Sequence, residues 1–460
     1  MPLKEAAYRP YMLTLLAVIL ASNGVDRLAL SLLLQEIKVD LALSDTQLGL
    51  MSGIAFAIFY SLMGIPIARW ADKGNRVTII TVTTALWSVA VGLCALAGNF
   101  VQLLLIRVGV AVGEAGCIPP AHSLIADHFS RTERPRALSR YMLGGPLSAV
   151  FGYLLAGWLN ELYGWRLTFL IVGIPGLLLA IVAWFTLREP RRQGMLNARE
   201  QASKEWPDAQ ESSPSLREVF VTLWTIPTFR HLMFSFAAVS FFSYGIGKWK
   251  PAFFIRSFGM ETGELGAWFT LIYGVGGLLG IYLGGALASR FAARNERLQL
   301  KMMALTYAAF AVVSTAMYLV SNVYVAFALM AIATIGGNSV AGPVFATIQT
   351  LVPPRMRAMS IALLYLFANL VGLGLGPLGV GMLSDAIAPW AGTESLRYVL
   401  LVLSPGYLWG AWHLWRASTT VVRDMEVTYE REMTSSDSAQ VEASSNAPRR
   451  IPGETVSSSI

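Results

Sequence analysis

The segment GYLLAGWLNE at residues 152–161 has a counterpart in GPLGVGMLSD at residues 376–385, 224 positions later. Three further pairs of segments repeat in the same order, at offsets of 217–223 residues. They are SDTQLGL (44–50) with ETGELGA (261–267), GNF (98–100) with SNV (321–323), and RALS (136–139) with RAMS (357–360). Any one pair is weak evidence, but four in order indicate an internal duplication with two similar halves.

Both halves consist of apolar segments long enough to cross a membrane. Of the 460 residues, 55% are hydrophobic and only 14% are charged, whereas a soluble domain carries about 25% charged residues. About 20 apolar residues in a helix span a hydrocarbon core about 30 Å thick. Twelve such stretches are expected, at roughly 11–36, 46–69, 77–97, 100–127, 136–160, 166–187, 229–254, 264–288, 298–320, 322–349, 356–384 and 397–416. The sequence therefore predicts an all-α membrane protein with six helices in each half.

A polar linker separates the halves. Residues 190–215 are rich in Gln, Ser, Glu and Lys, so they bury too little apolar surface to fold alone. The segment SLREVFVTLWTI that follows is expected to form an amphipathic helix on the cytoplasmic interface. The predicted organisation is an N-terminal half (1–189), a cytoplasmic linker with this helix (190–227), a C-terminal half (228–418) and a disordered cytoplasmic tail (419–460).

The basic residues behind the net charge of +7 are distributed unevenly between the connections of the predicted spans. Arg and Lys gather in every second connection between predicted spans, as at 131–140 and 188–192, whereas connections such as 97–100 are nearly neutral. The positive-inside rule places the basic connections and both termini in the cytoplasm. Membrane topology thus explains the excess of basic residues, and no nucleic-acid partner is needed to account for it. The short loops favour the bacterial inner (plasma) membrane, and we expect a monomer among membrane lipids.

Catalytic and cofactor signatures are not expected in this chain. Its two cysteines, Cys94 and Cys117, fall inside predicted spans, and four scattered histidines add no metal-ligand spacing. The sequence has no nucleotide-binding loop and no nucleophile–base pair that would indicate an enzyme or an ATP-driven pump. An even number of spans per half instead makes the repeats parallel. In transporters of this kind the substrate site lies near the midplane between the halves, which favours a carrier with alternating access.

The loop ARWADKGNRV (68–77) resembles the signature of the major facilitator superfamily, G-x-x-x-D-R-x-G-R-R, after the second helix. Asp72 and Arg76 match the signature, and Lys73 replaces an arginine. The second-half copy, GALASRFAAR (285–294), retains Arg290 but has Ser289 at the acidic position. The resemblance implies a twelve-helix fold around a central cavity. It also implies a gate loop in which the acid caps helix ends and pairs with basic residues. A plain positive-inside loop is the alternative interpretation.

Within that superfamily the sequence is similar to the spinster family of lysolipid and sphingolipid transporters. Three stretches carry the likeness: N-x-x-D-R at 23–27, RVGVAVGEAGCIPPAHSLIADHF at 107–129 and RALSRYMLGGPLSAVFGY at 136–153. The resemblance implies that the cargo is an amphipathic, lipid-like anion of the lysophospholipid or sphingolipid type. The alternative on the same fold is a proton-coupled exporter of drugs or small organic anions.

Five ionisable residues fall deep within predicted spans: Asp26, Arg27, Arg107, Glu114 and Lys248. Each costs about 2.5–3.5 kcal/mol at a helix centre on insertion scales, so such residues face the bundle interior and mark a pathway. The spacing of seven residues places Arg107 and Glu114 on one helix face. We expect Asp26 and Glu114 to carry protons, with Arg27 and Arg107 as counter-charges. Arg107 or Lys248 could instead hold an anionic head group, and static ion pairs are a further alternative.

Aromatic residues are expected along the cavity of such a carrier. The candidates on cavity-lining helices are Phe59, Tyr60, Tyr141, Tyr244 and Tyr365. Bundle packing is the alternative for most of them. Together these patterns predict a secondary active transporter, coupled to protons, that needs no cofactor or metal.

Overall fold

The computed structural model describes residues 5–130, 132–190, 216–291, 295–352 and 356–445, and every regular element in these ranges is helical. The helices of the first half are α1 (Glu5–Asp40), α2 (Asp45–Ser52), α3 (Ile54–Lys73), α4 (Arg76–Leu93), α5 (Phe100–Glu114), α6 (Ile118–His128), α7 (Arg134–Met142) and α8 (Gly144–Thr186). Those that follow are α10 (Leu216–Trp224), α11 (Pro227–Phe258), α12 (Thr262–Phe269), the π-helical turn η4 (Thr270–Gly276), α13 (Gly277–Phe291), α14 (Glu296–Met317), α15 (Val323–Ser339), α16 (Ala341–Leu351), α17 (Arg357–Phe367), the π-helical turn η6 (Ala368–Leu375), α18 (Gly376–Ala391), α19 (Ser395–Leu403) and α20 (Tyr407–Ser445).

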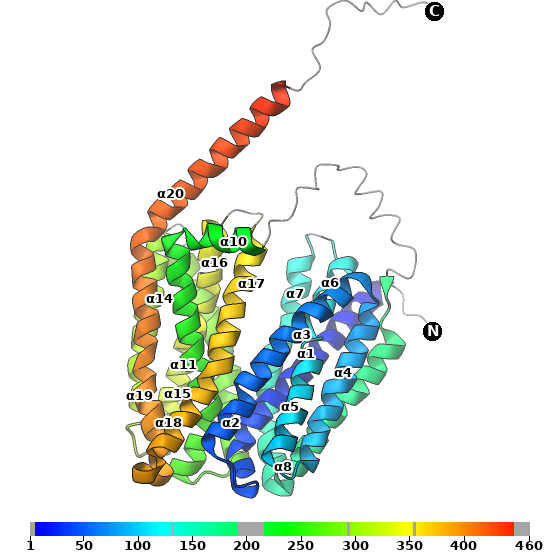
Figure 1. Cartoon of the computed structure of the whole chain (residues 1–460), viewed down its shortest axis with the longest axis vertical. Coiled ribbons are helices and arrows are strands. Elements are labelled where there is room, and N and C mark those ends of the chain that lie inside the picture. Colours follow the sequence, from blue (N-terminus) through cyan, green and yellow to red (C-terminus); the bar gives the residue numbers. More distant parts are fainter. Residues whose placement is uncertain (1–4, 131, 191–215, 292–294, 353–355, 446–460) are drawn as a thin grey trace, which may run out of the picture.

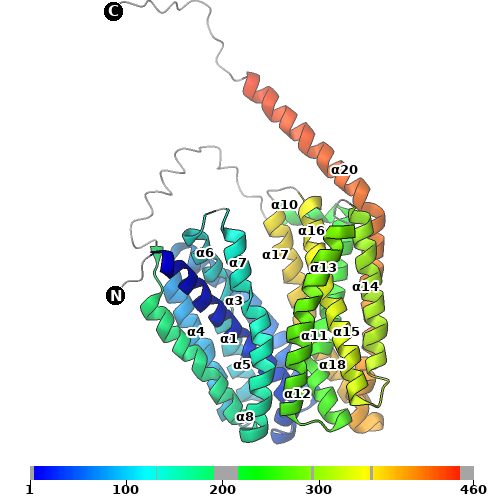
Figure 2. The ribbon, with the colours of Figure 1, turned by 180° about the vertical axis from the view of Figure 1, so that it is seen from behind.

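The helices form two bundles that lie side by side (Figures 1 and 2). One bundle holds α1 to α8 and the other α11 to α20, while α10 lies across one end of the second bundle. Nine stretches of the described residues are long and apolar enough to cross a membrane. Two of them, 136–186 and 359–427, each hold two crossings, and α11 adds another. The predicted twelve-helix fold with two halves is confirmed.

A backbone break at Gly164 divides α8 into two crossings. Gly164 has φ of +75° and ψ of 168° inside an otherwise helical run. Glycine adopts this region without the steric cost that a Cβ atom brings. The break falls between the fifth and sixth stretches expected from the sequence, 136–160 and 166–187.

The polar tail differs from the expected disorder. From residue 419 onward α20 continues as a helix to Ser445 and projects beyond the bundle (Figure 1). Its first turns are anchored, because Val421 is buried and Asp424 accepts hydrogen bonds from the backbone nitrogen and hydroxyl of Thr228, at 2.9 and 2.7 Å. Asp424 thereby satisfies an otherwise unpaired N–H in the first turn of α11. The helix expected after the linker is present as α10; its place on the membrane surface stays a prediction, and 191–215 lie outside the described residues.

The two bundles contact each other at the end opposite α10, where α8 packs on α12 and α2 on α18. We call this the closed end. A Cβ atom added to Gly157 of α8 would lie 2.4 Å from the carbonyl oxygen of Thr262 in α12. A Cβ atom added to Gly381 of α18 would lie 2.3 Å from the carbonyl oxygen of Asp45 in α2. The two glycines hold equivalent positions in the repeated segments 152–161 and 376–385. The duplication therefore gives each half one glycine that contacts the backbone of the other half.

Carboxylates of these repeated segments also cap helix starts in the opposite half. Glu161 accepts a hydrogen bond from the backbone nitrogen of Gly263, at 2.8 Å. Asp385 accepts two, from the backbone nitrogens of Asp45 and Thr46, at 3.0 and 2.7 Å. The first N–H groups of a helix have no partner within it and carry partial positive charge, so a carboxylate stabilises them. Each half thus completes a helix start of the other half.

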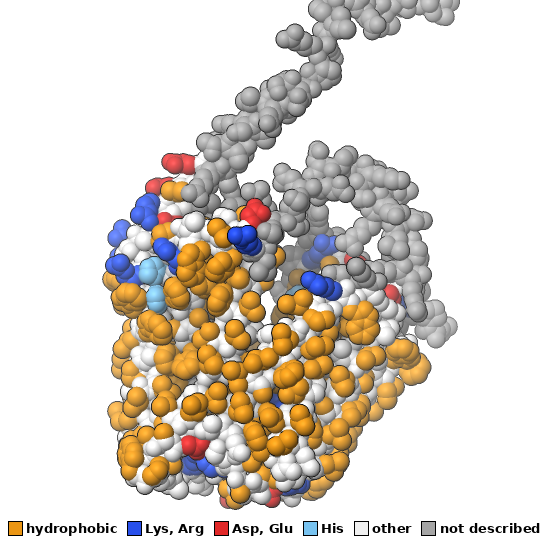
Figure 3. All heavy atoms as spheres, viewed as in Figure 1, with side chains coloured by type: hydrophobic (Ala, Val, Ile, Leu, Met, Phe, Trp, Pro, Cys, Tyr) orange, Lys and Arg blue, Asp and Glu red, His pale blue; other side chains and the backbone are white. Residues whose placement is uncertain are grey.

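The outer surface of the bundles is apolar. Large hydrophobic side chains cover the sides of the molecule, and most charged side chains in view lie toward its two ends (Figure 3). A surface of this kind suits contact with lipid chains along the sides and with water at the ends. The chain is therefore an integral membrane protein.

We expect Gly157→Ala to destabilise the protein and Gly145→Ala, on the same helix, to leave it intact. The methyl group at 157 collides with backbone, and such overpacking costs about 1–3 kcal/mol. An added Cβ at Gly145 meets nothing within 4 Å, and alanine favours a helix by roughly 0.5–1 kcal/mol over glycine. Thermal unfolding of the purified proteins measures the difference. Equal Tm values for the two variants would contradict this account of the closed end.

Candidate functional site

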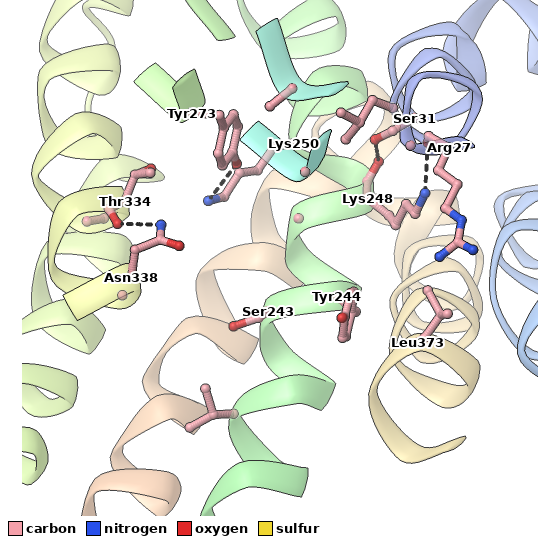
Figure 4. A pocket seen from close by; sticks show the side chains of 18 of the residues that line it. Arg27, Ser31, Ser243, Tyr244, Lys248, Lys250, Tyr273, Thr334, Asn338 and Leu373 are labelled. Atoms are coloured by element: carbon pink, nitrogen blue, oxygen red, sulfur yellow. Dashed lines mark hydrogen bonds between the residues drawn. The ribbon is translucent and has the colours of Figure 1, made fainter. Parts of the chain in front are cut away.

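A cavity of about 680 Å³ lies between the two halves. Residues of α1 and α8 line it from the first half, and those of α11, η4, α14, α15, η6 and α20 line it from the second (Figure 4). Three of the lining residues are cations, namely Arg27, Lys248 and Lys250, and no carboxylate is among the described residues that line the cavity. Tyrosine, serine, threonine and asparagine side chains supply neutral polar groups. The wall is therefore positively charged and suited to an anion.

Four of the buried charges predicted from the sequence form two ion pairs between α1 and α5. Arg27 pairs with Glu114, and Arg107 Nη1 lies 3.0 Å from Asp26 Oδ2. Adjacent residues on a helix point about 100° apart, so Asp26 and Arg27 reach different partners on α5. The acids and bases are thus paired across two helices rather than with their neighbours in sequence.

The two ion pairs lie close together around Phe56 of α3. The centroid of its ring lies 4.7 Å from the Arg27 guanidinium carbon and 5.6 Å from that of Arg107. Asp26 and Glu114 are buried, with exposed fractions of 1% and 0%, whereas the Arg27 side chain is 26% exposed and lines the cavity. One oxygen of each acid, Asp26 Oδ1 and Glu114 Oε1, has no hydrogen-bond partner among the described residues. The site is a buried charge cluster with one member that faces the cavity.

Lys248 connects the two halves beside this cluster. Its Nζ donates to the backbone carbonyl of Arg27 at 2.9 Å, and the hydroxyl of Ser31 donates to the carbonyl of Lys248 at 2.7 Å (Figure 4). These reciprocal bonds hold α11 against α1. Lys248 is therefore at the boundary between the halves, and its predicted role with an anionic head group stays a prediction.

Lys250, two residues further along α11, is a cavity cation that the sequence reasoning missed. Its Nζ lies 3.4 Å from the hydroxyl of Tyr273 on η4 (Figure 4). The signal that would have found it is the same as for Lys248, a lysine inside an apolar stretch expected at 229–254. A lysine near the end of such a stretch is ordinarily expected to extend to the solvated interface.

The predicted cavity aromatics have different surroundings. Tyr244 lines the cavity, and the ring of Tyr60 lies 4.8 Å from the Arg27 guanidinium. Tyr141 is fully buried against His122 within the first half, and Tyr365 stacks on Phe345 within the second. Phe59 is 39% exposed on α3.

Of the five predicted aromatics only Tyr244 is part of the described lining of the cavity; Phe59, Tyr60, Tyr141 and Tyr365 are absent from it. Packing within one half accounts for the last two, because Tyr141 contacts His122 edge-to-face and Tyr365 stacks on Phe345 of the same bundle. The tyrosines that do line the cavity are Tyr153, Tyr244, Tyr273, Tyr307 and Tyr407. Several helices of both halves contribute them, so no single sequence period distinguishes them from packing residues.

The gate loop between α3 and α4 is organised by Arg76. This arginine is fully buried and pairs with Glu189, which also accepts a hydrogen bond from the Arg76 backbone nitrogen at 2.6 Å. A second carboxylate, Asp127 at the end of α6, lies 2.5 Å from Arg76 Nη1. Asn75 caps α4 by accepting from the Thr78 nitrogen at 3.0 Å. Arg76 therefore ties the start of α4 to the ends of α6 and α8 within the first half.

The other predicted gate residues are less informative. The side chains of Asp72 and Lys73 lie outside the described residues, so their predicted role as a latch stays a prediction. Arg290 is exposed near the end of α13. The acids that partner Arg76 were not identified from the sequence, although Asp127 falls within the I-A-D-x-F segment quoted for the spinster resemblance.

Asp45 concentrates the polar contacts of the closed end. Its carboxylate accepts two hydrogen bonds from Arg256 of α11, at 2.6 and 2.8 Å, and lies 2.6 Å from Lys38 Nζ. The hydroxyl of Ser384 on α18 donates to it at 2.7 Å. Two-point arginine–carboxylate pairs combine charge with fixed geometry. A single carboxylate thus joins four helices at the end where the halves meet.

The sequence matches the model of the Major Facilitator Superfamily over residues 15–377. It is 33% identical over 411 residues to an MFS-type efflux pump of Mycolicibacterium smegmatis, with 89% of this chain and 92% of that protein covered. It is 26% identical over 289 residues to protein spinster homolog 1 of Xenopus laevis, which covers 60% of this chain and 53% of that protein.

Solved structures give the same result. The crystal structure of a bacterial homologue of the human lysosomal transporter Spinster, inward-facing and unoccupied, matches with a TM-score of 0.80 and 30% identity, over 91% of this chain and 98% of that one. The occupied inward-facing form matches with a TM-score of 0.76 and 31% identity over the same shares. The resemblance to the superfamily and to spinster proteins, drawn from the sequence, is confirmed.

We expect Glu189→Gln to destabilise the protein strongly and Glu133→Gln to do so only slightly. Glu189 neutralises the fully buried Arg76, and breaking a buried ion pair from one side costs about 3–5 kcal/mol; Asp127 remains as a partner, which favours the lower figure. Glu133 pairs with Arg9 near the surface, with half of its side chain exposed, and such pairs contribute little. Tm values from thermal unfolding compare the two. A Glu189→Gln protein as stable as the parent would show that Arg76 does not need this acid.

Proposed function

The chain belongs to the major facilitator superfamily, and on that premise we propose that it is a proton-coupled secondary transporter that moves an amphipathic, lipid-like anion by alternating access. The observation that carries the proposal is the pair of buried ion pairs, Glu114–Arg27 and Asp26–Arg107, of which Arg27 alone lines the cavity. A buried carboxylate next to a cargo cavity is a recurrent feature of proton-driven carriers.

The coupling follows from the position of Arg27. Cargo that enters the cavity changes the surroundings of this guanidinium and hence the strength of its pair with Glu114. A buried carboxylate that loses its counter-charge is costly, so Glu114 takes up a proton when Arg27 moves away. Asp26 is held in the same way by Arg107, and the unpartnered oxygen of each acid gives a proton a place to bind.

The charge of the cavity supports an anionic cargo. Its described lining holds three cations and no carboxylate, together with apolar groups such as Leu28, Phe310 and Leu373. A mixed wall of this kind accommodates a charged head and an apolar body. The similarity to a bacterial spinster homologue supports a lysophospholipid or sphingolipid type of cargo.

A second candidate is a proton-coupled exporter of drugs or small organic anions. The observation that favours it is the 33% identity to an efflux pump over 89% of the chain. The buried acids serve either cargo equally well, so the choice depends on what the cavity accepts.

The orientation in the membrane is part of the proposal. We infer that the end with α10 and the basic connections faces the cytoplasm, as the positive-inside rule requires. The contacts between the halves gather at the opposite end, which with this orientation supports an inward-facing state like that of the bacterial spinster homologue. We expect a monomer in the bacterial inner membrane.

The proposal predicts cargo-dependent proton flux that requires both acids. Proteoliposomes with an internal pH-sensitive dye and an imposed pH gradient are supplied with lysophosphatidate or with glucuronate as a small organic anion. We expect flux with lysophosphatidate for the parent protein, and flux reduced to the level of protein-free liposomes for Asp26→Asn and for Glu114→Gln. Asp40→Asn is the matched control, because Asp40 lies on the same helix as Asp26 but pairs with Arg166 at the exposed end.

The outcomes separate the candidates. Flux with glucuronate but not with lysophosphatidate would favour the small-anion exporter. Normal flux in both acid variants would overturn the coupling and make the two ion pairs structural. Movement of labelled cargo without any proton flux would leave a facilitator or an exchanger.

A further inference from the structure

Lys250 is a buried cation in the part of the cavity that belongs to the second half. Its side chain is 7% exposed, and its nearest polar partner is the hydroxyl of Tyr273, 3.4 Å from Nζ. Nζ also lies 5.8 Å from the centroid of the same ring. None of the ion pairs formed between described residues includes Lys250. A buried ammonium group with a phenol as its partner is poorly compensated.

The other two cations of the cavity have partners. Arg27 pairs with Glu114 and stacks on Phe56, and Lys248 donates to the carbonyl of Arg27. Residues two apart on a helix point about 200° apart, so Lys248 faces the first half while Lys250 faces Tyr273 in the second (Figure 4). The charge available to a ligand is therefore in the second half, away from the acids.

The surroundings of Lys250 are those of an anion site. Tyr273 lies on the π-helical turn η4, and its ring stacks on Tyr153 of the first half with centroids 5.5 Å apart. The side chains of Thr334 and Asn338 on α15 line the same part of the cavity (Figure 4). Asn338 Nδ2 donates to the carbonyl of Thr334 at 2.9 Å, which fixes the orientation of the amide. A lysine acts as a point charge for an anion. The Thr334 hydroxyl donates to the carbonyl of Met330 at 2.8 Å, so the neutral donors left for an anion are the Tyr273 hydroxyl and the second N–H of Asn338 Nδ2.

We propose that Lys250, with the Tyr273 hydroxyl and the Asn338 amide of the same cavity, binds the anionic head group of the cargo. The inference rests on the proposed function, because it names the place where that cargo binds. It locates the head group at Lys250 in the second half rather than at Arg27, which pairs with Glu114 in this structure, or at Lys248, which donates to backbone. Proton and cargo then bind on opposite sides of one cavity.

The test measures binding to the purified, full-length protein, which does not depend on transport. The probes are lysophosphatidate, a monoacylglycerol with the same acyl chain but no charge, and inorganic phosphate as a competitor. The variants are Lys250→Met, Lys250→Arg, Lys248→Met and the control Lys301→Met. Lys301 is a lysine of α14 that lies over the ring of Trp415, 5.3 Å from its centroid, and is not among the residues that line the cavity.

We expect Lys250→Met to weaken lysophosphatidate binding by about tenfold to a hundredfold, as for the loss of one charge-assisted hydrogen bond. Binding of the monoacylglycerol should stay unchanged, Lys250→Arg should retain most of the affinity, Lys248→Met should lose less affinity than Lys250→Met, and Lys301→Met should behave like the parent. Competition by inorganic phosphate that disappears in Lys250→Met would support the same site and show that a free phosphate also fits it.

Three results would overturn the inference. They are equal weakening of the charged and uncharged probes by Lys250→Met, a loss of lysophosphatidate affinity in Lys248→Met but not in Lys250→Met, and no binding of lysophosphatidate by the parent. Thermal unfolding of each variant verifies that it is folded. Failure of the proposed function gives a different pattern, in which lysophosphatidate binds in a Lys250-dependent way but drives no proton flux in proteoliposomes.

Discussion

Two close backbone contacts, each made by one glycine, determine how the two halves meet. Gly157 and Gly381 let α8 and α18 approach the carbonyl oxygens of Thr262 and Asp45 in the opposite half. Side-chain contacts follow from this approach, because Glu161 and Asp385 cap α12 and α2 only when those helix starts are close. The cavity, with Lys248 beside Arg27, exists because the halves are joined at one end. A repeated segment therefore fixes both the symmetry of the closed end and the position of the site.

The duplication preserves the close glycine contact in both halves, but the buried acids are present in the first half alone among the equivalent positions compared below. By the repeat offsets of 221 and 223, Asp26 corresponds to Gly247 and Glu114 to Gly337, and both glycines line the cavity. A Cβ atom at Gly247 would meet nothing within 4 Å, so this position leaves open space where the first half has an acid. The first half thus holds the buried ion pairs, and the second half has the open space and the cation that we assign to the proposed cargo.

Much of this architecture could be predicted from the sequence. The length of the apolar stretches and the repeat offsets indicate the helices and the halves, and the cost of burying charge singles out Asp26 and Glu114. The pairing was not predictable, because spacing shows that Arg107 and Glu114 share a face of α5 but not which residue of α1 faces each. Residue 419 looked like the start of disorder because the tail is polar, yet Asp424 anchors it by capping α11. Such contacts join segments far apart in sequence, which local patterns do not reveal.

The position of the charge cluster links the movement of the halves to proton binding. Arg76 ties the start of α4 to α6 and to the segment after α8 through Asp127 and Glu189, all within the first half. In alternating access by rocking, one half moves against the other around the site, where α1 and α11 cross. The reciprocal bonds of Lys248 and Ser31 lie at that crossing, and the carbonyl that Lys248 binds belongs to Arg27. A shift of α11 against α1 therefore acts directly on Arg27, the residue that neutralises Glu114. The proposed coupling between cargo and proton needs no chain of further residues between the two helices.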